Sequence, residues 1–190
     1  MTGRLPPTRR VLLICGSARA GSTNAAVLRT AAAVVPTGVE TVYFDGLQRL
    51  PLFNPDDDLE GNTPHPEVAA LRAAVQASDC VLICTPEYAG ALPAALKNVL
   101  EWTIGDAGTY GKPVAWINAS GPAAPTQGAD AHASLAKVLA YAGADVVAEA
   151  CLRLPVSRGD VGPDGLLGDE AQRREIAGAV SRLADHRPQS

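Results

Sequence analysis

Residues 11–35 read VLLICGSARAGSTNAAVLRTAAAVV and decide the fold. The run VLLIC at 11–15 is apolar and uncharged, which predicts a strand buried on both faces of a sheet. Residues 24–35 repeat apolar side chains at the i, i+3, i+4 and i+7 spacing of an amphipathic helix. A buried strand that passes through a short loop into such a helix is the first half of a βαβ unit. This stretch therefore favours an α/β protein.

The same alternation of strand and helix patterns continues along the chain. Further strands are predicted at 39–44, 80–85, 113–118 and 145–152, and further helices at 67–77, 96–100, 135–142 and 176–183. The second and fifth strands contain Glu40 and Glu149, which are tolerated at a sheet edge, whereas the other three carry no charge. We therefore predict one α/β domain over residues 1–190, a five-stranded parallel sheet of order 2-1-3-4-5 with helices on both faces.

The composition limits the class of partner. The 190 residues are 47% hydrophobic and 19% charged, which is enough apolar material for one core. The net charge is -4, and Lys and Arg form no cluster larger than the pairs Arg9-Arg10 and Arg173-Arg174. This distribution argues against nucleic acid or a membrane surface as a partner.

The cysteines and the apolar runs indicate the compartment. All four cysteines lie in or at the ends of apolar runs without a CxxC pair, so we interpret them as reduced, buried thiols; a zinc site or a redox dithiol is the alternative. The run at 11–15 is shorter than the about seven to fifteen apolar residues of a signal peptide. No stretch approaches the roughly 20 residues of a membrane span. We expect the protein in the cytoplasm.

The predicted strand order identifies the loops that bind a ligand. In a 2-1-3-4-5 sheet, ligands lie in the crevice beyond the carboxyl ends of strands 1, 3 and 4. The loops at these positions are residues 16–23, 86–91 and 119–128. The Pro- and Asp-rich segment 51–66 is predicted to be a surface loop that covers the site.

The first loop reads GSARAGST and enters a helix, so its amides predict an anion site. A P-loop would have lysine where Ser22 stands, and a dinucleotide fingerprint would have glycine in place of Ala18. A tyrosine-phosphatase loop would have arginine in place of Gly21. The remaining hydroxyls and one planar guanidinium suit a monoester phosphate, and a serine N-cap beside a solvated arginine is the alternative. The candidate residues are Ser17, Arg19, Ser22, Thr23 and Asn24.

The second loop reads TPEYAG and follows the third strand directly. An aromatic side chain with Pro and Gly at this position can lie against a planar ring, and the amides of residues 87–90 can face ring heteroatoms. Flavin chemistry needs this geometry, because the protein mainly supplies position and hydrogen-bond donors. For Tyr88 alone, a surface aromatic in a turn is the alternative reading.

Two motifs resemble those of the NAD(P)H-dependent FMN reductases. GSxRxxSxN occurs at residues 16–24, and PEY followed by LKNxxEW occurs at 86–88 and 96–102. The resemblance covers residues 10 to 150 and implies a flavodoxin-like three-layer sandwich. It implies that the FMN phosphate is held by Ser17, Arg19, Ser22 and Asn24 and the isoalloxazine by Pro86, Glu87, Tyr88 and Gly90. Thr23, Ala89, Ser120 and Gly121 complete the predicted cofactor site.

The resemblance also implies an activity and partners. Such an enzyme passes hydride from NADH or NADPH through FMN to a flavin, quinone, azo compound or similar small acceptor, and no catalytic side chain is assigned. A homodimer or homotetramer is expected, with Val99, Leu100 and Trp102 in the interface, and a monooxygenase that receives reduced FMN is a possible partner. The alternatives are a flavin-binding electron carrier or sensor, and a degenerate domain kept for protein contacts.

The chain departs from the family pattern in two of the loops. The family usually has Asn where this chain has Ala89, and Pro122 and Pro125 remove amide donors from the third loop.

Two further groups of residues could carry chemistry. His132 is a candidate proton donor near the expected ligand face, with a solvated histidine as the alternative. Residues 56–60 include four acids, which are interpreted as a solvated turn rather than a metal site.

Overall fold

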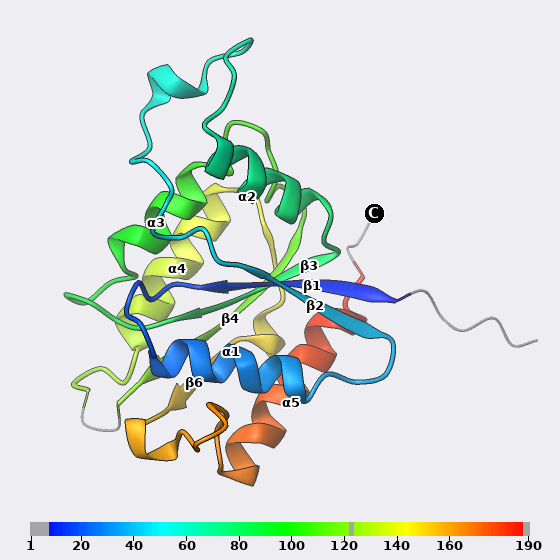
Figure 1. The fold of residues 1–190 in the computed structure, drawn as a ribbon, viewed down its shortest axis with the longest axis vertical. Coiled ribbons are helices and arrows are strands. Elements are labelled where there is room, and N and C mark those ends of the chain that lie inside the picture. Colours follow the sequence, from blue (N-terminus) through cyan, green and yellow to red (C-terminus); the bar gives the residue numbers. More distant parts are fainter. Residues whose placement is uncertain (1–7, 122–123, 188–190) are drawn as a thin grey trace, which may run out of the picture.

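The computed structural model describes residues 8–121 and 124–187, and its elements form three layers (Figure 1). The strands are β1 (Arg9–Cys15), β2 (Val39–Phe44), β3 (Cys80–Thr85), β4 (Pro113–Ser120), β5 (Asp145–Val146) and β6 (Leu152–Pro155). The helices are α1 (Thr23–Ala33), α2 (Pro66–Gln76), α3 (Ala94–Glu101), α4 (Ala129–Tyr141) and α5 (Glu170–Asp185). Short 3₁₀ turns are η1 (Pro55–Asp58), η2 (Ala148–Ala150) and η3 (Arg158–Asp160).

The parallel sheet confirms the predicted order. Its strands run β2-β1-β3-β4-β5, and β6 also pairs with β4. All these pairings are parallel; for example, Val11 of β1 stands opposite Cys80 of β3, and Val81 of β3 opposite Val114 of β4. The chain therefore reverses direction beside β1, and the carboxyl ends of β1, β3 and β4 lie together at one edge.

The prediction of one continuous fifth strand over 145–152 is wrong. Residues 145 and 146 pair with the start of β4, residues 148–150 turn as η2, and pairing with β4 resumes at Leu152. The interrupting segment reads AEA, and Ala and Glu are poor strand formers. The interruption matters for the site because β6 ends at Pro155, opposite Ser120 at the end of β4.

Alternate residues of the strands face two separate cores. Val11 and Leu13 pack toward α1 and α5, whereas Leu12 and Ile14 pack toward α2, α3 and α4. All four side chains are buried, and burial of each stabilises the fold by about 1.5–3 kcal/mol. The sheet is therefore covered on both faces, as Figure 1 shows with α1 and α5 on one side and α2, α3 and α4 on the other.

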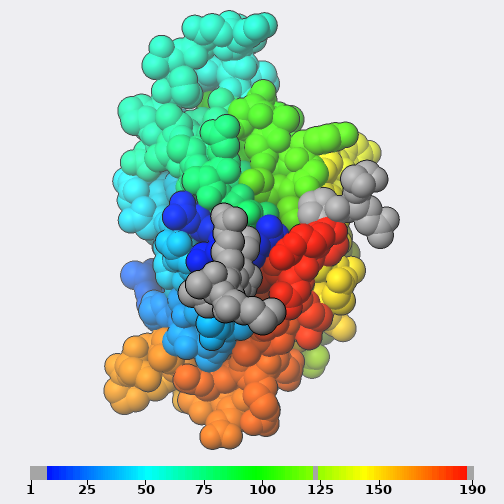
Figure 2. Space-filling view, turned by 90° about the vertical axis from the view of Figure 1, so that its right-hand side faces the viewer, coloured from blue at the N-terminus to red at the C-terminus, as the bar shows by residue number. Residues whose placement is uncertain are grey.

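The two ends of the described chain lie side by side. In Figure 2 the C-terminal helix, in red, packs beside the first strand, in blue. The Arg9 guanidinium donates to the carbonyl of Ala184 at 3.1 Å and to that of His186 at 3.3 Å. These contacts lie at the amino end of β1. They therefore join the two ends of the described chain on the side of the sheet opposite to the carboxyl strand ends.

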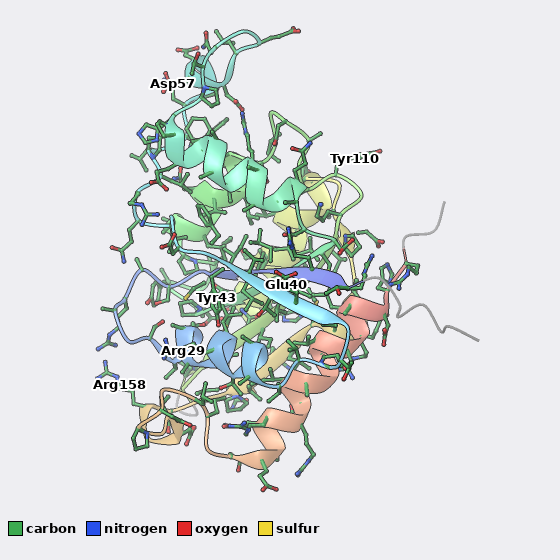
Figure 3. All side chains as sticks on the ribbon, turned by 45° about the vertical axis from the view of Figure 1, so that its right-hand side comes forward. Arg29, Glu40, Tyr43, Asp57, Tyr110 and Arg158 are labelled. Atoms are coloured by element: carbon green, nitrogen blue, oxygen red, sulfur yellow. The ribbon has the colours of Figure 1, made fainter. Side chains whose placement is uncertain are left out.

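The segment 51–66 does not cover the crevice, so that prediction is wrong. It projects beyond α2 and α3 as an arm (Figure 1), with Asp57 at the far end of the molecule from Arg158 (Figure 3). The base of the arm is fastened by Asn98, whose amide accepts from the Phe53 N–H at 2.7 Å and donates to the Pro51 carbonyl at 2.9 Å. The Trp102 indole donates to the same carbonyl at 2.8 Å. Asn98 and Trp102 of the LKNxxEW motif therefore have a structural role.

Three side chains expected in a subunit interface are instead buried in the protein's own core. Val99, Leu100 and Trp102 expose at most 2% of their surface. They belong to one core cluster with residues of β3 and β4, such as Ile83 and Trp116, so little of their surface is left for a partner. Within residues 8–121 and 124–187, no helix is both long and apolar enough to cross a bilayer.

Candidate functional site

The first loop begins at a glycine that permits close contact with the neighbouring strand. The Gly16 N–H donates to the Cys84 carbonyl at 2.7 Å. A Cβ at this position would lie 2.8 Å from Thr85 Oγ1 and 2.9 Å from a methyl carbon of Leu96. Because position 16 is glycine, the backbone of the first loop can pass directly against the end of β3. The first loop therefore starts beside the second loop, which follows β3.

Two serines organise this loop from within. Ser17 Oγ accepts from the Arg19 N–H at 3.3 Å, and Ser22 Oγ caps α1 by accepting from the Ala25 N–H at 3.1 Å. Both serines are buried. The amides of Thr23 and Asn24, earlier in the first helical turn, have no acceptor among residues 8–121 and 124–187 and lie at the positive end of the helix. The loop is therefore built to receive an anion.

Asn24 is held between this loop and the sheet. It is buried, and its Oδ1 accepts from the Cys84 thiol at 3.3 Å. The side-chain NH₂ remains the group that can donate to a ligand. Burial raises the pKa of Cys84 well above its ordinary value, so this thiol stays protonated and serves as the donor.

Two arginines border the same end of the cavity. Arg19 comes from the first loop, and Arg158 comes from η3 after β6, where it extends outward in Figure 3. In the part of the chain that the structure describes, neither guanidinium has a carboxylate within 4.0 Å. Both are exposed. Two unpaired cations beside free helix amides suit a doubly charged phosphate.

The second loop makes a tight turn. Tyr88 and Ala91 exchange backbone hydrogen bonds of 3.0 and 3.1 Å, and between them Ala89 and Gly90 take φ of 51° and 71°. The expectation that every amide of residues 87–90 faces a ring needs correction, because the Tyr88 N–H is used within the turn. The Tyr88 side chain is 51% exposed at the rim of the cavity, where it can lie against a planar group.

The Glu87 carboxylate is turned away to α4. It accepts from the N–H groups of Asp130 at 3.1 Å and Ala131 at 3.0 Å, and from the Thr126 hydroxyl. These hydrogen bonds, that of Thr126 above all, lower the pKa of Glu87 below its ordinary value. The side chain is therefore an ionised acceptor that is already occupied.

The third loop supplies an unused hydrogen-bonding group. Ser120 Oγ is buried and has no hydrogen-bond partner among the described residues. Ser120 lies in the cavity wall with Gly121, at the carboxyl end of β4. A buried group without a partner is costly, so a ligand that bonds to Ser120 would stabilise the site. Pro125 also lines the cavity, and Pro122 lies outside the described residues.

His132 lies behind the cavity and is not among the residues that line it. Its Nδ1 is 2.9 Å from the Trp116 indole nitrogen and 2.9 Å from Asn118 Oδ1. Burial, and to a smaller extent the positive charge of Arg153, lower the pKa of His132. Because the indole N–H of Trp116 can only donate, Nδ1 is an acceptor, and the Asn118 amide must then face it with its NH₂ group rather than with Oδ1. A neutral imidazole held in this way fits the position better than a proton donor to a bound acceptor.

These loops surround one cavity of about 580 Å³. This volume lies in the usual range for a small-molecule site. All twelve residues of the predicted cofactor site line it: Ser17, Arg19, Ser22, Thr23, Asn24, Pro86, Glu87, Tyr88, Ala89, Gly90, Ser120 and Gly121. The unpaired Ser120 hydroxyl, the free helix amides and the two arginines fit FMN, which has a phosphate at one end and a ring with hydrogen-bonding edges at the other.

Sequence reasoning missed part of the wall. The cavity is also lined by Gly21, Ala119, Ala124, Pro125, Val156, Ser157 and Arg158. The last three follow β6, whose end lies beside Ser120, and the Val156 N–H donates to the Ser120 carbonyl at 2.8 Å. A signal was available, because the carboxyl-end rule applies to the fifth strand as well as to strands 1, 3 and 4.

The sheet order and the cavity at the carboxyl strand ends define a flavodoxin-like α/β protein. Residues 9–156 match the family model described as NADPH-dependent FMN reductase, and the chain belongs to this family.

Individual relatives are similar over part of their length. The chain is 36% identical over 113 residues to an NAD(P)H-dependent FMN reductase from Pseudomonas aeruginosa, covering 58% of this chain and 60% of the relative. It is 36% identical over 99 residues to an NAD(P)H:quinone oxidoreductase from Solanum tuberosum, covering 50% of each. The similarity thus spans about half to three-fifths of these relatives.

A solved structure is similar over nearly the whole chain. The flavoenzyme NAD(P)H:(acceptor) oxidoreductase FerB from Paracoccus denitrificans superposes with a TM-score of 0.81 at 25% identity. The superposition covers 94% of this chain and 96% of that protein. The three-layer architecture is therefore shared beyond the region in which the sequences align best.

Proposed function

We propose that this chain is an NAD(P)H-dependent FMN reductase that delivers electrons to a flavin, quinone, azo compound or similar small acceptor. The observation that carries the proposal is the meeting of an anion-binding loop and an aromatic turn in one cavity at the carboxyl edge of the sheet. Family membership and the similarity to an FMN reductase and a quinone oxidoreductase support it.

Each wall of the cavity has a distinct task in this proposal. Ser17, Arg19 and Arg158, together with the amides at the start of α1, would hold the phosphate. Tyr88 and the amides of Ala89 and Gly90 would flank the ring, and Ser120 would donate to its polar edge. Bound FMN supplies the acceptance of hydride from NADH or NADPH and its onward transfer. The exposed rim at Tyr88 would receive the nicotinamide and then the acceptor.

Adding FMN to the purified protein tests the proposal. We expect the flavin fluorescence to be quenched on binding, NADPH or NADH to be consumed only when FMN is present, and the consumption to be faster when a quinone is also added. Bound flavin without turnover would favour an electron carrier or sensor. A protein that binds no flavin would overturn the proposal and favour a domain kept for protein contacts.

We propose one FMN-binding domain over residues 1–190, since a single sheet joins strands from Arg9 to Pro155 and helix α5, which ends at Asp185, packs on it. Four free cysteines support a reducing compartment, the cytoplasm. A homodimer or homotetramer would use exposed apolar side chains beside α3 and α4, such as Ile104 and Tyr141. Transfer of reduced FMN to a monooxygenase stays a prediction.

A further inference from the structure

Helix α4 starts without a cap from its own sequence. The N-cap residue is Gly128, which has φ of 81° and no side chain that could cap the helix. Gln127 before it also has a positive φ, of 49°. Free amides in the first turn of a helix are normally satisfied by a Ser, Thr, Asp or Asn at the N-cap. The start of α4 therefore depends on a group from elsewhere in the chain.

Glu87 provides that group from the second loop of the cavity. One carboxylate oxygen accepts from the Asp130 and Ala131 amides, and the other accepts from the Thr126 hydroxyl. The donors lie 39 to 44 residues further along the chain. Asp130 Oδ2 also lies near the second loop, 3.8 Å from where a Cβ on Gly90 would stand. The Glu87 side chain thus joins the two loops.

We propose that Glu87 is a positioning residue, which fixes the ring-binding turn 86–91 to the loop 124–131 and so sets the separation of two walls of the flavin cavity. This inference rests on the proposed function. It differs from the role that the family resemblance implies, in which Glu87 contacts the isoalloxazine. With both oxygens occupied, the Glu87 carboxylate acts on the flavin through the loops that it joins.

A purely stabilising cap is the competing explanation, and the chain offers a matched control. Asp169 is the N-cap of α5, where its carboxylate accepts from the Gln172 N–H at 2.8 Å. Asp169 does not line the cavity. Glu87→Gln and Asp169→Asn therefore each neutralise a carboxylate that caps a helix, but only the first lies between the two loops of the site.

The test compares both variants with the wild type by FMN titration, urea unfolding and backbone amide exchange measured by NMR on the flavin-free protein. We expect Glu87→Gln to raise the FMN dissociation constant about fivefold or more, with Asp169→Asn unchanged. We expect Glu87→Gln to speed exchange at Asp130 and Ala131 and also at Tyr88 and Ala91, across the cavity. Asp169→Asn should speed exchange only in α5.

The outcomes separate this inference from the proposed function. Equal loss of FMN affinity in both variants, or none in Glu87→Gln, would overturn the positioning role while leaving the reductase assignment intact. If the wild type binds no FMN, the proposed function fails, and amide exchange then decides the inference. Unchanged exchange at Tyr88 and Ala91 in Glu87→Gln would show that the carboxylate does not hold the second loop.

Discussion

Tyr88 and Ala91 exchange two backbone hydrogen bonds and thereby force the two residues between them into the left-handed region of φ. Such a two-residue turn favours Asn-Gly, because both central residues need a positive φ. This chain has Ala89 before Gly90, with φ of 51° at the alanine. The Asn that the family usually has here therefore has a conformational reason as well as the possible contact with the ring.

Replacing Ala89 by asparagine should stabilise the protein. Relief of the left-handed alanine is expected to raise the free energy of unfolding by about 0.5–1 kcal/mol, measured by urea denaturation. Ala107, with φ of 53° in a turn outside the cavity, should give a similar gain on Ala107→Asn without any change in FMN affinity. Ala18→Asn, in an exposed loop without a positive φ, is the unstrained control. No gain at Ala89 would contradict the turn assignment.

Removing either arginine should weaken the binding of FMN but not that of riboflavin. We expect Arg19→Ala to reduce FMN affinity about tenfold or more, because a charge-assisted contact with phosphate is worth about 1.5–3 kcal/mol. Arg158→Ala should act in the same direction. Fluorescence titration with both flavins measures the effect, and riboflavin, which has no phosphate, should bind equally well to wild type and variants. Arg174→Ala, on the exposed face of α5, is the control. An equal loss of affinity for FMN and for riboflavin would show that the arginines do not contact the phosphate.

Truncating Asn98 should destabilise the fold and leave the cavity intact. Asn98→Ala removes two of the three side-chain hydrogen bonds described at the base of the arm and leaves the Phe53 N–H without its acceptor. We expect a loss of about 2 kcal/mol in the free energy of unfolding. Trp102→Phe, which removes the indole bond to the Pro51 carbonyl, should cost less. FMN affinity should stay at the wild-type value in both, and a selective loss of affinity would assign the motif to the cofactor instead.

His132 should make stability depend on pH. Burial lowers its pKa in the folded protein below the ordinary value of 6.5. As the pH falls below this value, the imidazole takes up a proton more readily in the unfolded chain than in the folded one. The stabilisation of the fold by neutral His132 is therefore present above about pH 6.5 and is lost as the pH falls. The difference in urea midpoint between wild type and His132→Gln should therefore shrink from pH 7.5 toward acid pH. A difference that is constant across this range would show that the imidazole titrates normally.

The sequence by itself determined the layers and most of the residues that line the cavity. Uncharged strands such as VLLIC and helices with one apolar face are local patterns, and burying them allows few arrangements other than a covered parallel sheet. Topology then places the loops after β1, β3 and β4 at one edge. Serine at position 22 could be interpreted locally, because a helix cap depends on residues that are neighbours in the sequence.

Only the tertiary structure decided the contacts between residues that are distant in the chain. Arg158 reaches the cavity because the break at η2 lets β6 end beside Ser120, and the loop then turns toward the first loop. The carboxylate of Glu87 is committed to α4, and Asn98 to the arm, through hydrogen bonds to groups more than 30 residues away. Local periodicity reports which face of an element is apolar. It carries no information about which polar groups meet, because that depends on how separately formed elements pack.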